Sequence, residues 1–101
     1  MSRKHKYPRE VIDEIKNKTD IEEIISEHLE LKKNNGVSGD YKALCPFHKE
    51  KTPSFKVVTD RQIYHCFGCG ASGDVFEFLM KIKGLSFLES VEYLGRRLNL
   101  L

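Results

Sequence analysis

Two short motifs of cysteine and histidine constrain this chain more than any other feature of its sequence. Cys45 and His48 form a C-x-x-H pair, Cys66 and Cys69 form a C-x-x-C pair, and 17 residues separate the two pairs. A gap of two residues lets one tight turn place both members of a pair on the same ion, and zinc prefers four tetrahedral thiolate or imidazole ligands. The spacing therefore predicts one zinc ion held by these four side chains.

The sequence predicts a structural rather than a catalytic metal centre. Four protein ligands leave no open position at which zinc could activate a water molecule. The tripeptide HKE at residues 48–50 matches the H-x-E motif of zinc deaminases, but that match fails because His65 rather than proline precedes Cys66, and because Cys45 adds a fourth ligand. His65 is a rival ligand, although strand alternation should direct its side chain away from the Cys66 sulfur.

The surroundings of the motifs indicate a reduced, aqueous environment. In the string CFGCG, Gly68 and Gly70 permit the positive φ angles that a metal-binding turn often needs. Three cysteines do not suit the disulfide framework of a secreted domain. No apolar run approaches the roughly eighteen residues of a membrane span, so we expect a cytoplasmic protein with no membrane partner.

Helices are predicted at both ends of the chain. Apolar residues recur at helical spacing over 8–18 and again over 19–29. Near the C-terminus, Ser72 is predicted to cap a helix that ends at about Lys83, with Gly84 after it. The pattern SFLE at 86–89 is typical of a capping box and predicts the start of the last helix.

The middle of the chain shows the features of a small sheet instead. Four runs rich in β-forming residues are separated by turn residues, at 29–33, 40–45, 54–58 and 62–66. We therefore expect an α+β fold, a zinc ribbon with a small antiparallel β-sheet flanked by N- and C-terminal helices. The expected organisation is a single domain over 1–101, with a helical arm at 1–30, a zinc ribbon at 31–70 and C-terminal helices at 71–101.

Charge is distributed unevenly although the formal net charge is only +2. Residues 8–30 hold eight acidic side chains against three basic ones, whereas residues 31–66 hold seven basic against three acidic. In the predicted hairpin, alternation puts Phe55 and Val57 on one face and Lys56 on the other. A basic face with tyrosine and histidine tips would suit a platform for single-stranded nucleic acid. The same pattern fits an ordinary solvated sheet face equally well.

Three strings carry a resemblance to a known family, namely CPFHKEKTPSF at 45–55, QIYHCFGCGASGDVFEFLM at 62–80 and SFLESVEYLGRRL at 86–98. Together with the opening segment VIDEIKNKTDIEEIISEHLELKK, they make nearly the whole chain similar to the N-terminal zinc-binding domain of bacterial DNA primase, the CHC2-type zinc finger. One position departs from the family pattern. A basic residue usually stands shortly before the tyrosine that corresponds to Tyr41, and here Gly39 and Asp40 stand there, after a longer turn.

The resemblance implies a zinc ribbon that helps a primase engage single-stranded template and that influences where primer synthesis starts and how far it runs. It implies one structural zinc ion on the same four ligands. Polymerisation belongs in this family to a separate downstream domain, so we expect this chain alone to be inactive as an enzyme. The residues implied to contact template DNA are Lys32, Lys51, Pro53 and Arg61, together with Tyr41, Lys56, Tyr64 and His65.

Partners and location follow from the same resemblance. It implies a single-stranded DNA template, the RNA polymerase domain of a primase in the same or a neighbouring molecule, and the replicative helicase through the full-length protein. It also implies a place at the replication fork, associated with the nucleoid. Two alternatives stay open, namely a stand-alone zinc-ribbon adaptor that binds a protein partner, and the zinc domain of a phage or mobile-element primase.

Overall fold

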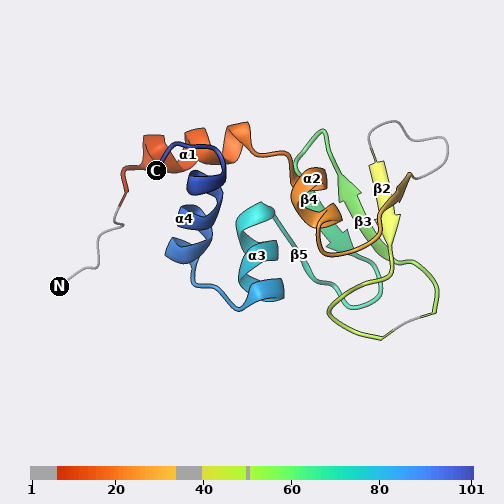
Figure 1. Ribbon diagram of the computed structural model, residues 1–101. Coiled ribbons are helices and arrows are strands. Elements are labelled where there is room, and N and C mark those ends of the chain that lie inside the picture. Colours follow the sequence, from red (N-terminus) through yellow and green to blue (C-terminus); the bar gives the residue numbers. More distant parts are fainter. Residues whose placement is uncertain (1–6, 34–39, 50) are drawn as a thin grey trace.

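A sheet lies at one end of the molecule and a group of helices at the other, in a computed structural model that describes residues 7–33, 40–49 and 51–101. Figure 1 shows α1 and α4 side by side at the end away from the sheet, with α2 and α3 between them and the strands. The elements in chain order are α1 (Arg9–Lys18), α2 (Ile21–Ser26), β1 (Lys32–Lys33), β2 (Asp40–Ala43), β3 (Phe55–Val58), β4 (Ile63–Cys66), β5 (Ser72–Gly73), α3 (Val75–Lys83) and α4 (Phe87–Arg97). This arrangement confirms the predicted α+β fold class. The turn before Asp40 that departs from the family pattern lies outside the described residues.

The five strands form one antiparallel sheet in sequence order. Residues that pair directly across neighbouring strands carry their side chains on the same face of the sheet. The register therefore assigns Tyr41, Val57 and Tyr64 to one face, which we call the inner face. The opposite, outer face carries a line of paired residues that crosses every strand, here called the outer row: Lys32, Lys42, Lys56, His65 and Ser72.

An aromatic cluster packs the inner face of the sheet against α3. The rings of Phe55 and Tyr64 are stacked with centroids 5.3 Å apart, and the Phe78 ring of α3 lies 5.8 Å from that of Tyr64. All three side chains are fully buried. Because aromatic side chains bury large apolar areas, this cluster fixes the β3–β4 hairpin against α3. It thereby fixes the end of the hairpin that carries Cys66.

The short strand β5 corrects the predicted start of α3. Ser72 pairs with His65 in the sheet, and the helix cap is Asp74. The Asp74 carboxylate accepts a hydrogen bond from the Glu77 amide at 3.0 Å, and the Glu77 carboxylate accepts one from the Asp74 amide at 3.2 Å. Because this capping box satisfies the first turn of α3, the prediction that Ser72 is the cap is wrong.

The predicted end of α3 and start of α4 agree with the structure, whereas α2 ends at Ser26, before the predicted residue 29. The Asp20 side chain caps α2 by accepting from the Glu22 amide at 3.2 Å. Ser86 and Glu89 form the predicted capping box of α4. Gly84 follows α3 with φ of 69°, in the left-handed region that glycine adopts without strain. None of the helices within the described ranges is long and apolar enough to cross a membrane.

Candidate metal centre and basic sheet face

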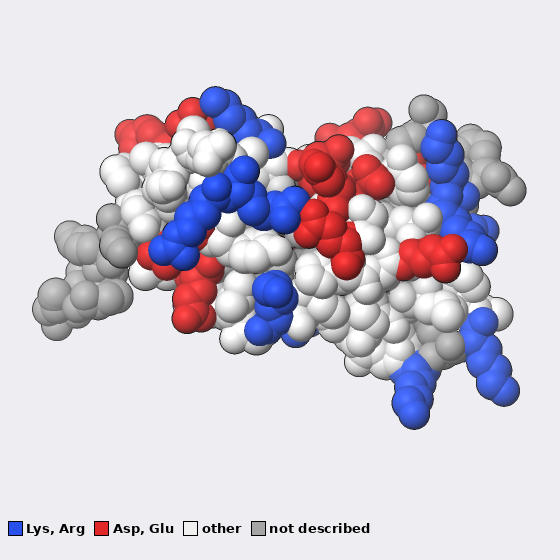
Figure 2. Space-filling model, in the orientation of Figure 1, with Lys and Arg blue, Asp and Glu red and all other residues white. Residues whose placement is uncertain are grey.

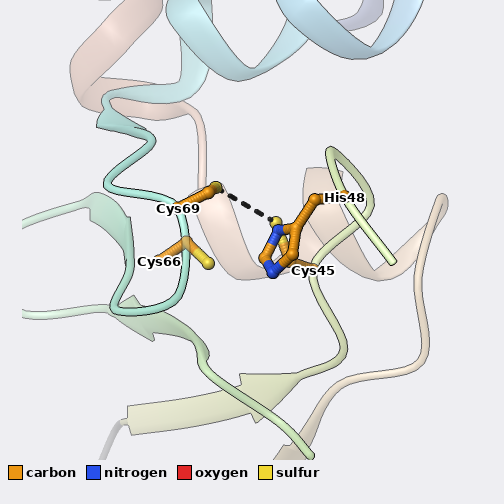
Figure 3. Close-up of side chains that lie close together, drawn as sticks. All are labelled: Cys45, His48, Cys66 and Cys69. Carbon is orange, nitrogen blue, oxygen red and sulfur yellow. Dashed lines mark hydrogen bonds between the residues drawn. The ribbon is translucent and has the colours of Figure 1, made fainter. Parts of the chain in front are cut away.

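Two loop segments bring four metal-binding side chains to one point. Cys45 and His48 follow β2, Cys66 ends β4, and Cys69 lies in the turn before β5. One donor atom from each lies within 4.8 Å of all the others, and Figure 3 shows the four side chains converging. The Sγ atoms of Cys45 and Cys69 are 3.8 Å apart, which is about the edge of a tetrahedron with Zn–S bonds of about 2.3 Å. The donors therefore fit a zinc ion.

Backbone amides of the two turns support the sulfur atoms. The Phe47 amide donates to the Cys45 Sγ at 3.4 Å, and the Gly68 amide donates to the Cys66 Sγ at the same distance. Gly70 has φ of 83°, as predicted for a metal-binding turn.

Gly68 is required for a different reason from the one expected. It is absent from the positive-φ glycines of the structure. A Cβ atom at this position would instead lie 2.7 Å from the Ser54 Oγ and 3.0 Å from the His48 Nε2. Gly68 therefore leaves room for the histidine ligand, and its prediction as a positive-φ residue is wrong.

The buried sulfur atoms differ in how readily they lose a proton. Burial raises the pKa of Cys45 to about 12. Burial also acts to raise the pKa of Cys66, but hydrogen bonds from Ser54 and from the amides of Cys69 and Gly68 outweigh it and lower that pKa to about 7. Several adjacent thiolates repel one another in the absence of a positive charge. A divalent cation among them removes this repulsion and deprotonates the thiols that bind it.

The residues present thus hold one structural zinc ion. With one nitrogen and three sulfur donors, the coordination is complete and the ion contributes to folding rather than to chemistry. His65 belongs to the outer row, on the face opposite to Cys66, and the metal-binding group found among the described residues does not include it.

The structure groups only some of the residues that were expected to contact template DNA. Lys32, Lys56 and His65 all belong to the outer row.

Lys51 and Pro53 line a groove of about 400 Å³ next to the end of that row, together with Lys32 and Lys42. Glu30 also lines the groove and is its only acidic residue within the described ranges. Figure 2 shows lysine and arginine side chains at the sheet end of the molecule, and acidic side chains gathered around α2.

The structure contradicts the expectation that tyrosine tips lie open on the basic face. Tyr64 is 0% exposed, and Tyr41 pairs opposite Val57 on the inner face and packs against the core. Arg61 lies in the turn between β3 and β4, at the end of the hairpin away from Cys66 and so away from the groove. The tyrosines are withdrawn because of the strand register, since a tyrosine one position away from an outer-face residue such as His65 must face the core.

Two residues of this surface were not among those expected to contact template DNA. Lys42 belongs to the outer row and lies between Lys32 and Lys56. Phe67, which follows β4, is 69% exposed. The period-2 alternation of DYKA, which places Lys42 on the face opposite to Ala43, was a signal that could have found the first of them.

The sheet, its flanking helices and its complete four-donor site define this chain as a zinc-binding domain of the zinc-ribbon class. A family model described as the CHC2 zinc finger matches residues 7–101. The chain therefore belongs to the CHC2 zinc finger family of DNA primases, as the sequence resemblance indicated.

Named relatives agree with this assignment. The chain is 57% identical over 90 residues to a DNA primase of Thermotoga maritima and 56% identical over 90 residues to one of Staphylococcus epidermidis. Each match covers 89% of this chain but only 15% and 14% of the respective primases. The crystal structure of the Aquifex aeolicus primase, with its zinc binding and RNA polymerase domains, matches with a TM-score of 0.79 and 41% identity, over 86% of this chain and 21% of that one. The chain thus corresponds to the zinc-binding domain of these primases.

Proposed function

We propose that this chain is the part of a DNA primase that engages single-stranded template DNA through the outer face of its sheet. The observation that carries the proposal is the alignment of Lys32, Lys42 and Lys56 across three neighbouring strands. Strands in a sheet lie about 4.8 Å apart, so the three lysines form a line about 10 Å long. A line of cations can follow the phosphates of an extended single strand.

The metal centre supports this role indirectly. Its four ligands come from the segments next to β2 and β4, so a bound ion fixes the strands that carry Lys42 and His65. The groove lined by Lys32, Lys42, Lys51 and Pro53 continues the basic surface beyond the sheet edge. The zinc site thus acts as a clamp that keeps the cations aligned.

The wider role belongs to the same proposal. A module that binds template DNA next to a polymerase domain would influence where a primer starts and how long it becomes. The polymerase domain would lie in the same molecule or in a neighbouring one, and the helicase would be reached through the full-length protein. Such a module would act at the replication fork.

Binding of a labelled oligothymidylate at several salt concentrations tests the proposal. The logarithm of the affinity for a single strand falls with the logarithm of salt concentration by about 0.7 for each phosphate neutralised. We expect Lys32→Ala and Lys56→Ala each to weaken binding and to reduce the slope by about 0.7. Lys33→Ala is the matched control, because Lys33 is the exposed neighbour of Lys32 on the same strand and pairs opposite Tyr41 of the inner face.

The control variant should keep both the affinity and the slope of the unmodified chain. Equal affinities and slopes for all four proteins would overturn the template proposal. That result would leave a protein-binding adaptor as the alternative function of this domain.

A further inference from the structure

Phe67 is the most exposed large apolar side chain in the described part of the chain. Its exposed fraction is 69%, compared with 51% for Leu44 and 43% for Leu101. A single exposed apolar residue is common on protein surfaces and needs no explanation by itself. The surroundings of this ring are what set it apart.

Two residues of the outer row flank the Phe67 ring. The imidazole ring of His65 meets it in an edge-to-face arrangement with centroids 4.4 Å apart, and the Lys56 Nζ lies 6.0 Å from its centroid. The ring therefore lies on the outer face, beside the cations that are proposed to hold phosphates. Neither contact covers the ring, because most of its surface stays in solvent.

The backbone of Phe67 is held firmly although its side chain is open. Its amide donates to the Ser54 carbonyl oxygen at 2.8 Å. Its neighbours Cys66 and Gly68 are joined by the amide-to-sulfur hydrogen bond of the metal-binding turn. The exposed ring is thus presented from a fixed position, which reduces the entropy lost when a flat ligand stacks on it.

We infer that Phe67 is a base-stacking residue, on which one base of a single-stranded nucleic acid packs while Lys56 contacts the adjacent phosphate. This inference rests on the proposed template-binding function and adds a residue and a contact type to it. The strand would cross the β-strands along the outer row, with its stacked base at the β4 end. Stacking on an aromatic ring is available to all four bases, so Phe67 adds affinity rather than sequence preference.

Charge favours a nucleic acid over a protein as the occupant. Lys32, Lys42 and Lys56 lie in one line with His65 on this face. The nearest acidic residue in that register is Asp40. It lies on the same face as Lys42 but in the next line of pairs, opposite Val58. An apolar ring next to a line of cations is the combination that binds a base and its phosphate together.

The chain contains no tryptophan, so Phe67→Trp creates a single fluorescent reporter at this site. The matched control is Tyr93→Trp on α4, because the Tyr93 ring is also flanked by two cations, with Lys83 at 5.3 Å and Arg97 at 5.8 Å from its centroid. We expect oligothymidylate to quench the fluorescence of Phe67→Trp and to leave that of Tyr93→Trp unchanged. The zinc content of each variant is measured first.

Affinity provides the second arm of the test. Phe67→Ala should bind oligothymidylate about tenfold more weakly, with an unchanged salt slope, because stacking neutralises no phosphate. An abasic oligonucleotide should bind the unmodified chain and Phe67→Ala equally. The stacking role would be overturned if Phe67→Trp is not quenched and Phe67→Ala binds with full affinity. If the lysine variants still lose affinity in that case, the proposed function stands. Absence of oligonucleotide binding by the unmodified chain at low salt would overturn the proposed function and the stacking role together.

Discussion

Tyr64 illustrates how one position in a strand decides between a binding and a packing role. Its ring is fully buried against Phe55 and Phe78. Burial, followed by the nearby carboxylates of Glu77 and Asp74, raises the pKa of its hydroxyl to about 12. This hydroxyl has no hydrogen-bond partner among the described residues. Tyr64 therefore stabilises the hairpin and is withdrawn from the proposed template-binding face.

Removal of the Tyr64 hydroxyl tests this assignment. We expect Tyr64→Phe to keep the affinity for single-stranded DNA and to leave the free energy of unfolding unchanged or raised by up to about 1 kcal/mol, because a buried polar group without a partner is costly. Tyr7→Phe is the matched control, because the Tyr7 hydroxyl donates to a Glu92 carboxylate oxygen at 3.0 Å. This variant should lose about 1 kcal/mol of unfolding free energy. Urea unfolding measures both. A greater loss of stability in Tyr64→Phe than in Tyr7→Phe would contradict the account.

At the scale of elements, local signals and non-local pairing differ in how far they can be predicted. The cap at Ser86 could be predicted because its hydroxyl accepts from the Glu89 amide only three residues away. The strand β5 could not, because two residues that include a glycine carry no β-forming pattern and are ordered only by pairing with β4. Ser72 was predicted as the cap of α3 because the strand β5 was not predicted.

The corrected start of α3 predicts a difference between two neighbouring polar residues. Asp74→Ala should lower the free energy of unfolding by about 1 kcal/mol, because it removes the capping carboxylate. The ion pair of Asp74 with Lys16 at 3.3 Å adds little, because the Lys16 side chain is 44% exposed. Ser72→Ala is the control and should change stability by less than about 0.5 kcal/mol. The cap assignment fails if Ser72→Ala proves the more damaging change in thermal unfolding.

At the scale of the whole molecule, the metal site was easier to predict than the surface it supports. Four ligands in two pairs are a local pattern, and their spacing alone predicted a site whose donor atoms converge within 4.8 Å. The outer row joins residues as far apart as Lys32 and Ser72, so it depends on the register of every strand. Exposure of single side chains, such as that of Phe67, also depends on the assembled sheet rather than on the local sequence.

The central claim is that one structural zinc ion holds together the segments that present the basic face. Structural zinc supplies roughly 10 kcal/mol of folding free energy in zinc-finger peptides, which is comparable to the whole stability of a small domain, about 5–15 kcal/mol. The most direct test is residue-resolved amide hydrogen exchange of the chain before and after verified removal of zinc by a chelator. We predict that amides over residues 40–70 lose their protection and regain it when zinc is restored. Unchanged protection in the zinc-free protein would contradict the claim.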